Sequence, residues 1–456
     1  MGSDVDGLWG LYGFRDNPYR FTELTPDQFD DGLYTSRGRA EAEFASAVTD
    51  ANGGVLVISG DYGTGKTSFA NILQHRLFNG TAGFGLRPMP AYERTSFQKG
   101  DSPTILARRI LENVIRSVER HCSVYHLKVP SETRRYKNWV FGGATQAANL
   151  AGVGLTVSPV MTSTVEACCE ILNNIVNECR LKLKVDGLFI CLDNAENLED
   201  IGTLSILLKD IRDSLLSIPK IWWIIIGQSD LYHQIERHNA AIAERIVGSG
   251  IQLDRLDVEE FHALIERRVR GYGKRPGAKA PLSRNIHNLL HEAAADQIRF
   301  ALHLGHTVLY NLNRKMYQFV EQQYSDLGRR PEGKKLLLDV LSLLRDRMGG
   351  ADAFPDEYVM SEIELISRGA LRRLLLPLQV CKALQLLSEA PFTQEQFLKI
   401  AGEQFSSFEY LDQLTKDRVV KKIDGDTPSW SLRHHAALLA RLGDLASAAG
   451  AAHGCS

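Results

Sequence analysis

Residues 55 to 68 read Val-Leu-Val-Ile-Ser-Gly-Asp-Tyr-Gly-Thr-Gly-Lys-Thr-Ser. The apolar run at 55–59 suits a buried parallel strand, and it leads into the pattern Gly60-x-x-x-x-Gly65-Lys66-Thr67. The amphipathic residues that follow predict a helix. A glycine-rich turn between a strand and the start of a helix is typical of a phosphate-binding loop, although a chance glycine turn is the alternative. This stretch therefore predicts an α/β fold that binds nucleotide phosphates.

The fixed positions of this loop have separate chemical roles. Its glycines allow backbone amides to turn inward onto phosphate oxygens. The ammonium of Lys66 is placed to reach the β- and γ-phosphates, and the hydroxyl of Thr67 is placed to ligate Mg²⁺. The pattern thus predicts ATP and Mg²⁺ as cofactors. The residues expected to contact the nucleotide phosphates are Gly60, Gly63, Thr64, Gly65, Lys66, Thr67 and Ser68.

A second apolar run, 188–192, ends in Asp193. An ATPase needs an acid at the end of a strand beside the phosphate loop, where it holds Mg²⁺ through a water. We therefore expect Asp193 to share the metal with Thr67. A strand that merely happens to stop at an aspartate is the alternative.

Length and composition narrow the class of protein. The 456 residues allow two to three domains, and 44% apolar residues suffice for a core in each. A formal net charge of -2 gives no global attraction to a polyanion. Seven cysteines without a Cys-x-x-Cys pair indicate reduced thiols. The start of the chain has no signal-peptide pattern, and the most apolar run, 221–226, is too short to span a bilayer, so a soluble cytoplasmic protein is expected.

These motifs together resemble AAA+ P-loop ATPases of the origin-recognition-complex-like group, which is related to the STAND signal-transducing ATPases. Asn17-Pro18-Tyr19 and the box Gly38-Arg39-Ala40-Glu41 resemble the leader of that group, whose box packs on adenine, except that Ala40 intervenes before the glutamate. The resemblance covers roughly residues 10 to 435. It implies an α/β AAA+ core with a parallel sheet, a helical lid and a C-terminal winged-helix domain.

The resemblance also implies domain boundaries. Residues 1–272 are expected to form the leader and the nucleotide-binding core, with an insertion at about 124–162. Residues 273–345 are expected to form the helical lid, and 346–456 a helical linker and the winged helix.

The winged-helix prediction rests on three short helical patterns followed by two strand-like runs. Such domains often bind DNA through the third helix. Here that helix carries three acids against one lysine, which would repel phosphate, whereas two lysines follow on the wing. Both a protein and DNA therefore stay open as partners of this module. The charged residues concerned are Glu409, Asp412, Lys416, Asp417, Lys421 and Lys422.

Three further residues match AAA+ functional positions. Gln228, after the apolar run 221–226, resembles the first sensor of the γ-phosphate, and helix capping is its ordinary alternative. Arg245, in a predicted helix 240–247, matches the arginine finger given to the next subunit, so the resemblance implies an ATP-promoted homo-oligomer. Arg299 resembles the second sensor, on the predicted lid.

One position departs from the AAA+ pattern. Those enzymes commonly follow the metal-binding aspartate with a glutamate that polarises the attacking water, and this chain has Asn194. An amide cannot accept a proton, so about 10²- to 10⁴-fold of general-base assistance is expected to be missing unless Glu196 replaces it. We expect an ATPase whose hydrolysis is slow or gated by a partner.

Two functions remain open. Basic stretches at 134–137 and 267–284 favour an oligomerising switch that regulates or loads onto DNA with partner proteins, although a solvated surface or hinge also explains such stretches. The acidic third helix, the low net charge and Asn194 favour instead a nucleotide-controlled protein-interaction switch of a bacterial defence or signalling system, without direct DNA binding.

Overall fold

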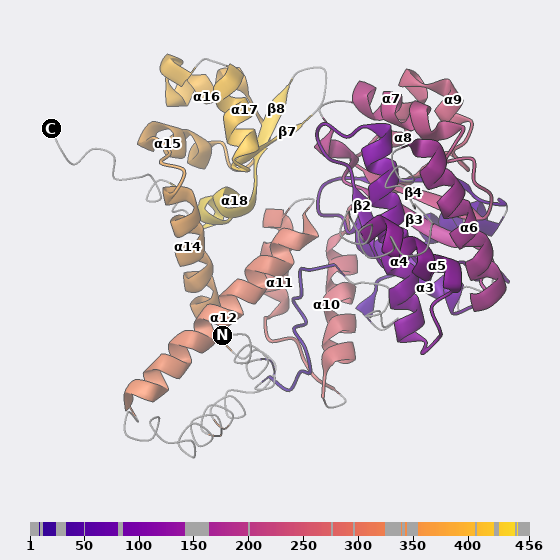
Figure 1. The fold of residues 1–456 in the computed structure, drawn as a ribbon. Coiled ribbons are helices and arrows are strands. Elements are labelled where there is room, and N and C mark those ends of the chain that lie inside the picture. The colour runs from indigo at the N-terminus through magenta and orange to yellow at the C-terminus, as the bar shows by residue number, and fades with distance from the viewer. Residues whose placement is uncertain are drawn as a thin grey trace, which may run out of the picture. The chain divides into compact units, whose positions relative to one another are not determined.

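The chain forms two compact units in the computed structural model (Figure 1). We call residues 23–31 and 36–255 the core unit, and residues 1–22, 32–35 and 256–456 the terminal unit. The structure describes residues 9, 12–23, 33–49, 51–80, 85–141, 164–198, 201–274, 277–294, 297–323, 339, 343, 354–405, 408–423, 428–442 and 445.

The core unit is built on a five-stranded sheet in which all paired strands are parallel. The strand order is β2-β3-β4-β1-β5. The strands β1 and β3 are apolar along nearly their whole length because helices cover both faces of the sheet. This confirms the predicted α/β core with a parallel sheet. The strands are β1 (Gly54–Gly60), β2 (Arg94–Ser96), β3 (Leu188–Asp193), β4 (Ile221–Gly227) and β5 (Ile251–Leu253).

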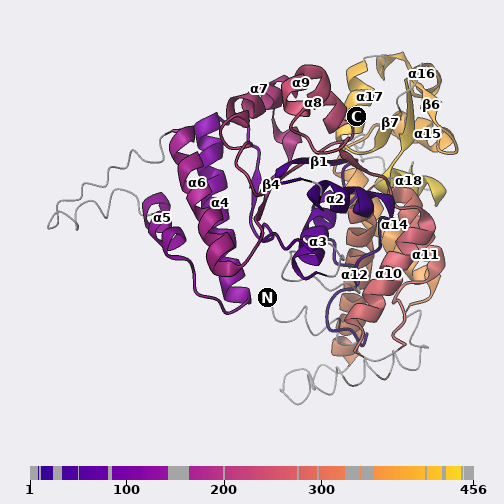
Figure 2. The same cartoon turned by 90° about the vertical axis from the view of Figure 1, so that its right-hand side faces the viewer.

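Alternate side chains of each strand pack against different helices. On one face Val57, Ile190 and Trp223 belong to a cluster with α4, α6 and α7. On the other face the ring of Phe44 in α2 contacts the rings of Phe69 in α3 and Phe189 in β3. Figure 2 shows α4, α5 and α6 on one side of the sheet and α2 and α3 on the other. The helices of this unit are α2 (Arg39–Thr49), α3 (Lys66–Phe78), α4 (Pro103–Val124), α5 (Ser131–Phe141), α6 (Val165–Leu183), α7 (Ile201–Arg212), α8 (Leu231–His238) and α9 (Ala240–Ala243), with a 3₁₀ turn η3 (Ala195–Asn197).

The terminal unit contains the leader as well as the predicted lid. Trp9, Phe14 and Tyr19 are buried in one cluster with α10, α11 and α12. The hydroxyl of Tyr19 lies 2.7 Å from Nε2 of His287 in α11. The compact units therefore divide the chain differently from the expected boundaries, because the leader packs on the lid helices. These helices are α10 (Val258–Tyr272), α11 (Arg284–Ala294), α12 (Ile298–Gln323) and α14 (Asp356–Arg372).

The C-terminal module has its elements in the predicted order. Three helices are followed by two strands, and a short strand precedes the second helix, giving an antiparallel sheet of order β6-β8-β7. Trp430 is buried at its centre. The identification of this module as a winged helix remains a proposal. Its elements are α15 (Leu378–Leu386), β6 (Phe392–Thr393), α16 (Gln394–Ala401), α17 (Phe408–Lys416), β7 (Val420–Ile423) and β8 (Ser429–Leu432).

A final helix, α18 (His434–Arg441), was not predicted. It packs on α14 and α11, and Leu438 joins the same apolar cluster as the leader. The ring of His434 stacks on Phe300 of α12, with ring centroids 4.1 Å apart. This helix therefore ties the C-terminal module to the lid helices.

One sequence prediction of secondary structure was wrong. The predicted helix 240–247 ends at Ala243, because the following turn brings the carbonyl of Arg245 to the backbone amide of Val55. Within the expected insertion at 124–162, α5 packs against α4 and α6 and buries Tyr136; the insertion itself remains a prediction. Residues 142–163 lie outside the described part of the chain. Among the described helices, none is long and apolar enough to cross a bilayer.

Candidate nucleotide site

The phosphate loop connects β1 to α3 with two glycines in the left-handed region. Gly63 has φ +84° and Gly65 has φ +90°, which side chains rarely adopt. A Cβ at Gly60 would lie 2.7 Å from the carbonyl oxygen of Leu253 in β5. The glycines therefore permit both the tight turn and the close approach of the loop to the neighbouring strand. Thr64 is buried within the loop, and Ser68 is half-buried in the first turn of α3.

The structure brings Lys66, Thr67 and Asp193 together at the carboxyl ends of the parallel strands. Lys66 Nζ donates to the carbonyl oxygens of Gly60 and Asp61, each at 2.9 Å. Thr67 Oγ1 donates to Asp193 Oδ2 at 3.2 Å, although 126 residues separate the two in sequence. The phosphate lysine and the two expected magnesium residues thus form one site.

Asp193 is buried, and both of its carboxylate oxygens are engaged. Oδ1 accepts the backbone amide of Asn194 at 2.8 Å, and Oδ2 accepts from Thr67 and from a guanidinium nitrogen of Arg94 at 2.5 Å. Arg94 also pairs with Glu23. Burial alone would lower the pKa of the Arg94 guanidinium, but the two carboxylates together raise it above its usual value. Sequence reasoning missed this ion pair, because nothing in the local pattern of β2 indicates it.

A second set of contacts braces the phosphate loop. Asp61 accepts a hydrogen bond from Ser229 at 2.7 Å and from Arg255 Nε at 2.9 Å. Arg37 donates to the carbonyl oxygen of Thr64 at 2.9 Å and to that of Asp254 at 3.1 Å. The loop is therefore held against the ends of β4 and β5 by side chains that the sequence motif does not include.

The glutamate of the leader box has a structural role in the core unit. Glu41 accepts the backbone amide of Arg37 at 2.5 Å and pairs with Arg76 of α3 at 2.9 Å. It thereby fixes the backbone from which Arg37 reaches the phosphate loop. Its expected packing on adenine remains a prediction.

Three residues near the strand ends have distinct positions. Asn194 has φ +58°, and its side-chain amide donates to Ser96 Oγ of β2 at 3.0 Å. Glu196 is exposed on η3, and Gln228 is exposed after β4. The residue after β4 that contacts the loop is Ser229, through Asp61, so the first-sensor role of Gln228 remains a prediction.

The two predicted arginines lie in different units. Arg245 is half-exposed in the turn after α9, with a guanidinium nitrogen 3.8 Å from Asp213. Arg299 is exposed in the first turn of α12 in the terminal unit. Their roles as arginine finger and second sensor remain predictions.

The donor set of the site fits Mg²⁺. A hydroxyl and a carboxylate are the hard oxygen ligands that this ion prefers. Among the described residues there is no group of three or more His, Cys, Asp or Glu side chains that could hold a metal. Mg²⁺ commonly relies on one or two protein ligands and on nucleotide phosphates, so Thr67 and Asp193 suffice.

The two basic stretches noted in the sequence are largely paired within the protein. In α10, Arg267 donates to the carbonyl oxygen of Tyr34 and the half-buried Arg268 to that of Arg20. In α5, Lys137 pairs with Glu119 at 2.7 Å and Arg135 with Glu132 at 3.4 Å. These side chains serve the fold, which leaves fewer free cations for a nucleic acid.

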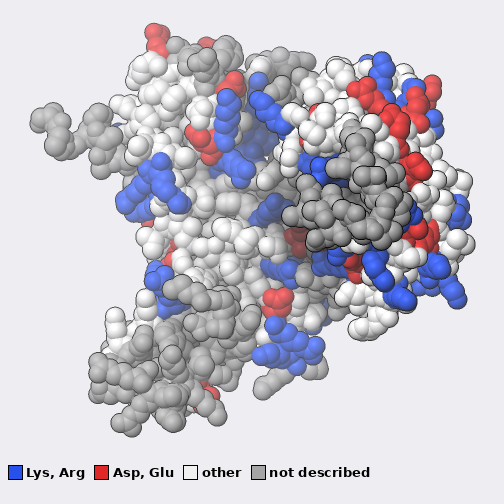
Figure 3. Space-filling model, viewed as in Figure 1, with Lys and Arg blue, Asp and Glu red and all other residues white. Residues whose placement is uncertain are grey.

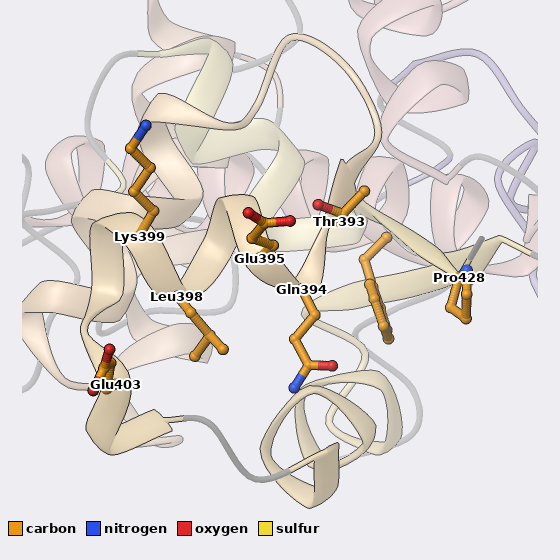
Figure 4. Close-up of a pocket in the computed structure, with 8 residues that line it drawn as sticks. Thr393, Gln394, Glu395, Leu398, Lys399, Glu403 and Pro428 are labelled. Atoms are coloured by element: carbon orange, nitrogen blue, oxygen red, sulfur yellow. The ribbon is translucent and has the colours of Figure 1, made fainter.

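The C-terminal module presents a more exposed basic segment. Lys416, Arg418 and Lys422 are exposed, and Figure 3 shows basic side chains gathered over α17 and β7 with acidic ones beside them. A separate hollow of about 670 Å³ lies beside α16. Its walls include Glu395, Lys399 and the buried Trp430, and Figure 4 shows the carboxylates of Glu395 and Glu403 among them. The hollow carries both signs of charge, so it does not favour an anionic ligand.

The fold and this site define a phosphate-loop protein with a parallel α/β core. No family model and no curated protein matches the sequence. Solved structures similar to it include the ORC1 protein of Aeropyrum pernix in complex with DNA, with 15% identity, 94% of this chain and 96% of that chain covered, and a TM-score of 0.44.

Two other solved structures show the same degree of likeness. The ORC2 protein of the same organism, in ADPNP-ADP complexes, is 14% identical, with 95% and 98% of the two chains covered and a TM-score of 0.44. A Walker-type ATPase of Pyrococcus abyssi is 11% identical, with 93% and 99% covered and a TM-score of 0.41. These identities and scores are low, so function has to be argued from the residues of this chain.

Proposed function

We propose that this protein binds ATP with Mg²⁺ at the phosphate loop and acts as a nucleotide-controlled switch. The observation that supports this most strongly is the hydrogen bond of 3.2 Å between Thr67 and Asp193. It joins the hydroxyl at the start of α3 to the acid at the end of β3, as magnesium ligation beside a phosphate loop requires.

Each residue at the site has a proposed role. Lys66 contacts the β- and γ-phosphates, and the amides from Gly60 to Ser68 bind phosphate oxygens. Bound Mg²⁺ supplies positive charge to the phosphates, and Thr67 and Asp193 hold it. Asn194 cannot take a proton from water, so hydrolysis is slow unless Glu196 or a partner assists.

We further propose that ATP promotes contact between copies of this chain in the cytoplasm. The half-exposed Arg245 is available to face the nucleotide of a neighbouring subunit. The remaining sensors are Gln228 and Arg299, which respond to the γ-phosphate in this proposal.

The first candidate function of the switch is to bind DNA through the C-terminal module, together with partner proteins. It is supported by the exposed side chains of Lys416, Arg418 and Lys422, which occupy one short segment at the end of α17 and in β7. Phosphate contacts need exposed cations of this kind. The proposed DNA surface therefore consists of residues other than those of the stretches 134–137 and 267–284.

The second candidate output is a partner protein of a bacterial defence or signalling system. It is supported by the internal pairing of Arg267, Arg268 and Lys137, which removes cations from a DNA surface. In this case the module transmits the nucleotide state without touching DNA.

The nucleotide proposal is tested with the purified protein and Lys66→Ala. We expect ATP with Mg²⁺ to raise the melting temperature of the wild type and not of Lys66→Ala, and we expect slow turnover that the variant abolishes. A wild type that gains no stability from ATP at saturating Mg²⁺ would refute nucleotide binding.

The two outputs are separated by binding to random duplex DNA at low and high salt. The DNA candidate predicts binding that weakens with salt and is lost in Lys416→Glu/Lys422→Glu. Arg134→Glu/Arg135→Glu, on the exposed surface of α5, is the matched control and should bind as the wild type does. Binding absent at the lowest salt favours the protein partner.

A further inference from the structure

Arg94 lies between two carboxylates at the edge of the candidate nucleotide site. One guanidinium nitrogen contacts Asp193 Oδ2 at 2.5 Å, and the other pairs with Glu23. The side chain of Arg94 is 23% exposed and that of Asp193 is 7% exposed, so water screens the contact poorly. β2 places Arg94 there because it pairs with β3 in parallel, with Ser96 opposite Asp193.

The oxygen that Arg94 contacts is the one that Thr67 contacts. Thr67 Oγ1 and the Arg94 guanidinium both donate to Asp193 Oδ2. Magnesium held by Thr67 draws on the negative charge of the same carboxylate. A guanidinium stays charged at any physiological pH, so it and the dication repel each other when both adjoin Asp193.

Glu23 is a second carboxylate with which Arg94 pairs, so Arg94 keeps one partner if it leaves Asp193. A guanidinium has five N–H donors in a planar fork, so it can keep one carboxylate while it releases another. Glu23 is 34% exposed and pairs with Nη2 of Arg94, whereas Asp193 pairs with Nη1. These three residues thus comprise one cation and two carboxylates that compete for it, and the proposed metal position adjoins one of the carboxylates, Asp193.

We propose that Arg94 is a positioning residue that competes with Mg²⁺ for Asp193, and that Glu23 retains Arg94 when the metal binds. This rests on the proposed binding of ATP with Mg²⁺. The balance between the two carboxylates sets the Mg²⁺ concentration at which the nucleotide is held tightly. The site then responds to free Mg²⁺ as well as to ATP.

The alternative is that Arg94 only braces the edge strand. If Arg94 only braces β2, its substitution changes the melting temperature but not the Mg²⁺ concentration at which the nucleotide is held. The matched control is Arg109, because it is as buried as Arg94, pairs with Asp101, and does not contact Asp193. Arg109→Gln reports what the loss of an ordinary buried ion pair does in the same unit.

The test is a Mg²⁺ titration of a fluorescent ATP analogue bound to the full chain. We expect Arg94→Gln to lower the half-saturating Mg²⁺ concentration about tenfold, because an adjacent cation changes carboxylate equilibria by about one to three decades. Glu23→Gln should raise the half-saturating Mg²⁺ concentration severalfold, because Arg94 then pairs with Asp193 and no longer with Glu23. Arg94→Lys keeps the charge but loses the planar fork, so its half-saturating Mg²⁺ concentration should lie between those of the wild type and Arg94→Gln, and that of Arg109→Gln should equal the wild type's.

The opposite directions of two variants make the result decisive. Equal half-saturation in Arg94→Gln and the wild type, or a shift of Glu23→Gln in the same direction as Arg94→Gln, overturns the inference. Melting temperatures without nucleotide identify any variant that is poorly folded, and Arg94→Lys then carries the comparison with Glu23→Gln. A wild type that holds no analogue at any Mg²⁺ concentration refutes the proposed function itself.

Discussion

The side-chain amide of Asn194 donates a hydrogen bond of 3.0 Å to the hydroxyl of Ser96 on the neighbouring strand β2. Asn194 also has φ +58°, a conformation that asparagine tolerates better than most residues. The position after Asp193, the proposed metal-binding aspartate, is therefore occupied by an amide that β2 holds in place.

We expect Asn194→Glu to raise ATP turnover by about tenfold or more, because a carboxylate there can act as a general base. Asn194→Gln is the control. Glutamine has the shape of glutamate and meets the same backbone strain at this position, but its amide cannot act as a base. Steady-state phosphate release measures both. Equal rates in the two variants would show that this position does not limit hydrolysis.

Arg37 should be needed for nucleotide affinity. Its guanidinium holds the carbonyl oxygens of Thr64 and Asp254, so Arg37→Ala loosens the phosphate loop from the end of β5. We expect ATP affinity to fall about tenfold, the effect of losing about 1.4 kcal/mol. Arg108→Ala is the control, because that side chain is 54% exposed and pairs with Glu112 of the same helix, α4. Calorimetry that gave equal affinities for the two variants would contradict this role.

Thr67 should determine how much Mg²⁺ strengthens the binding of ATP. Thr67→Val keeps the shape of the side chain but loses the hydroxyl that bonds Asp193 at 3.2 Å. We expect Mg²⁺ to tighten ATP binding in the wild type and in Thr67→Ser, and to have little effect in Thr67→Val. Affinities measured with Mg²⁺ and with EDTA test this, and a full Mg²⁺ effect in the valine variant would exclude Thr67 as a ligand.

Acid should destabilise the terminal unit through His287. Burial lowers the pKa of His287 to about 3, below the ordinary value near 6.5, so the unfolded chain binds the extra proton between these pH values. Stability is therefore lost as pH falls below about 6.5, by about 1.4 kcal/mol per pH unit for this group.

The measurement is urea unfolding at pH 7.0 and pH 5.0. His287→Gln, whose amide can still bond Tyr19, should lose less stability than the wild type over this interval. The exposed His233 is the control, and His233→Gln should follow the wild type. Parallel losses in all three proteins would show that His287 does not carry the acid sensitivity.

The phosphate site could be predicted from sequence because its motifs are local. The strand, the glycine turn and the first helical turn follow one another without a break in the sequence. The apolar run that ends in Asp193 is likewise one short continuous stretch. The pairing of Arg94 with Glu23 and Asp193 joins residues 71 and 99 positions apart, and no pattern along the chain marks such distant partners. The same holds for Asp61 with Arg255 and for Tyr19 with His287.

The helix after β4 shows a different limit. Residues 240–247 have the composition of a helix. The helix nevertheless ends at Ala243, because the carbonyl oxygen of Arg245 accepts a hydrogen bond from the backbone amide of Val55 in β1. Tertiary pairing outweighs a weak local preference in a short segment.

The terminal unit is assembled from both ends of the chain, with most of the core unit inserted between them. During synthesis Trp9, Phe14 and Tyr19 leave the ribosome more than two hundred residues before α10 to α12, which bury them. At about 5 to 20 residues per second this interval lasts roughly 10 to 50 seconds. The aromatic leader thus waits on the nascent chain for as long as the core unit takes to emerge, and the terminal unit can fold only after the core unit has been synthesised.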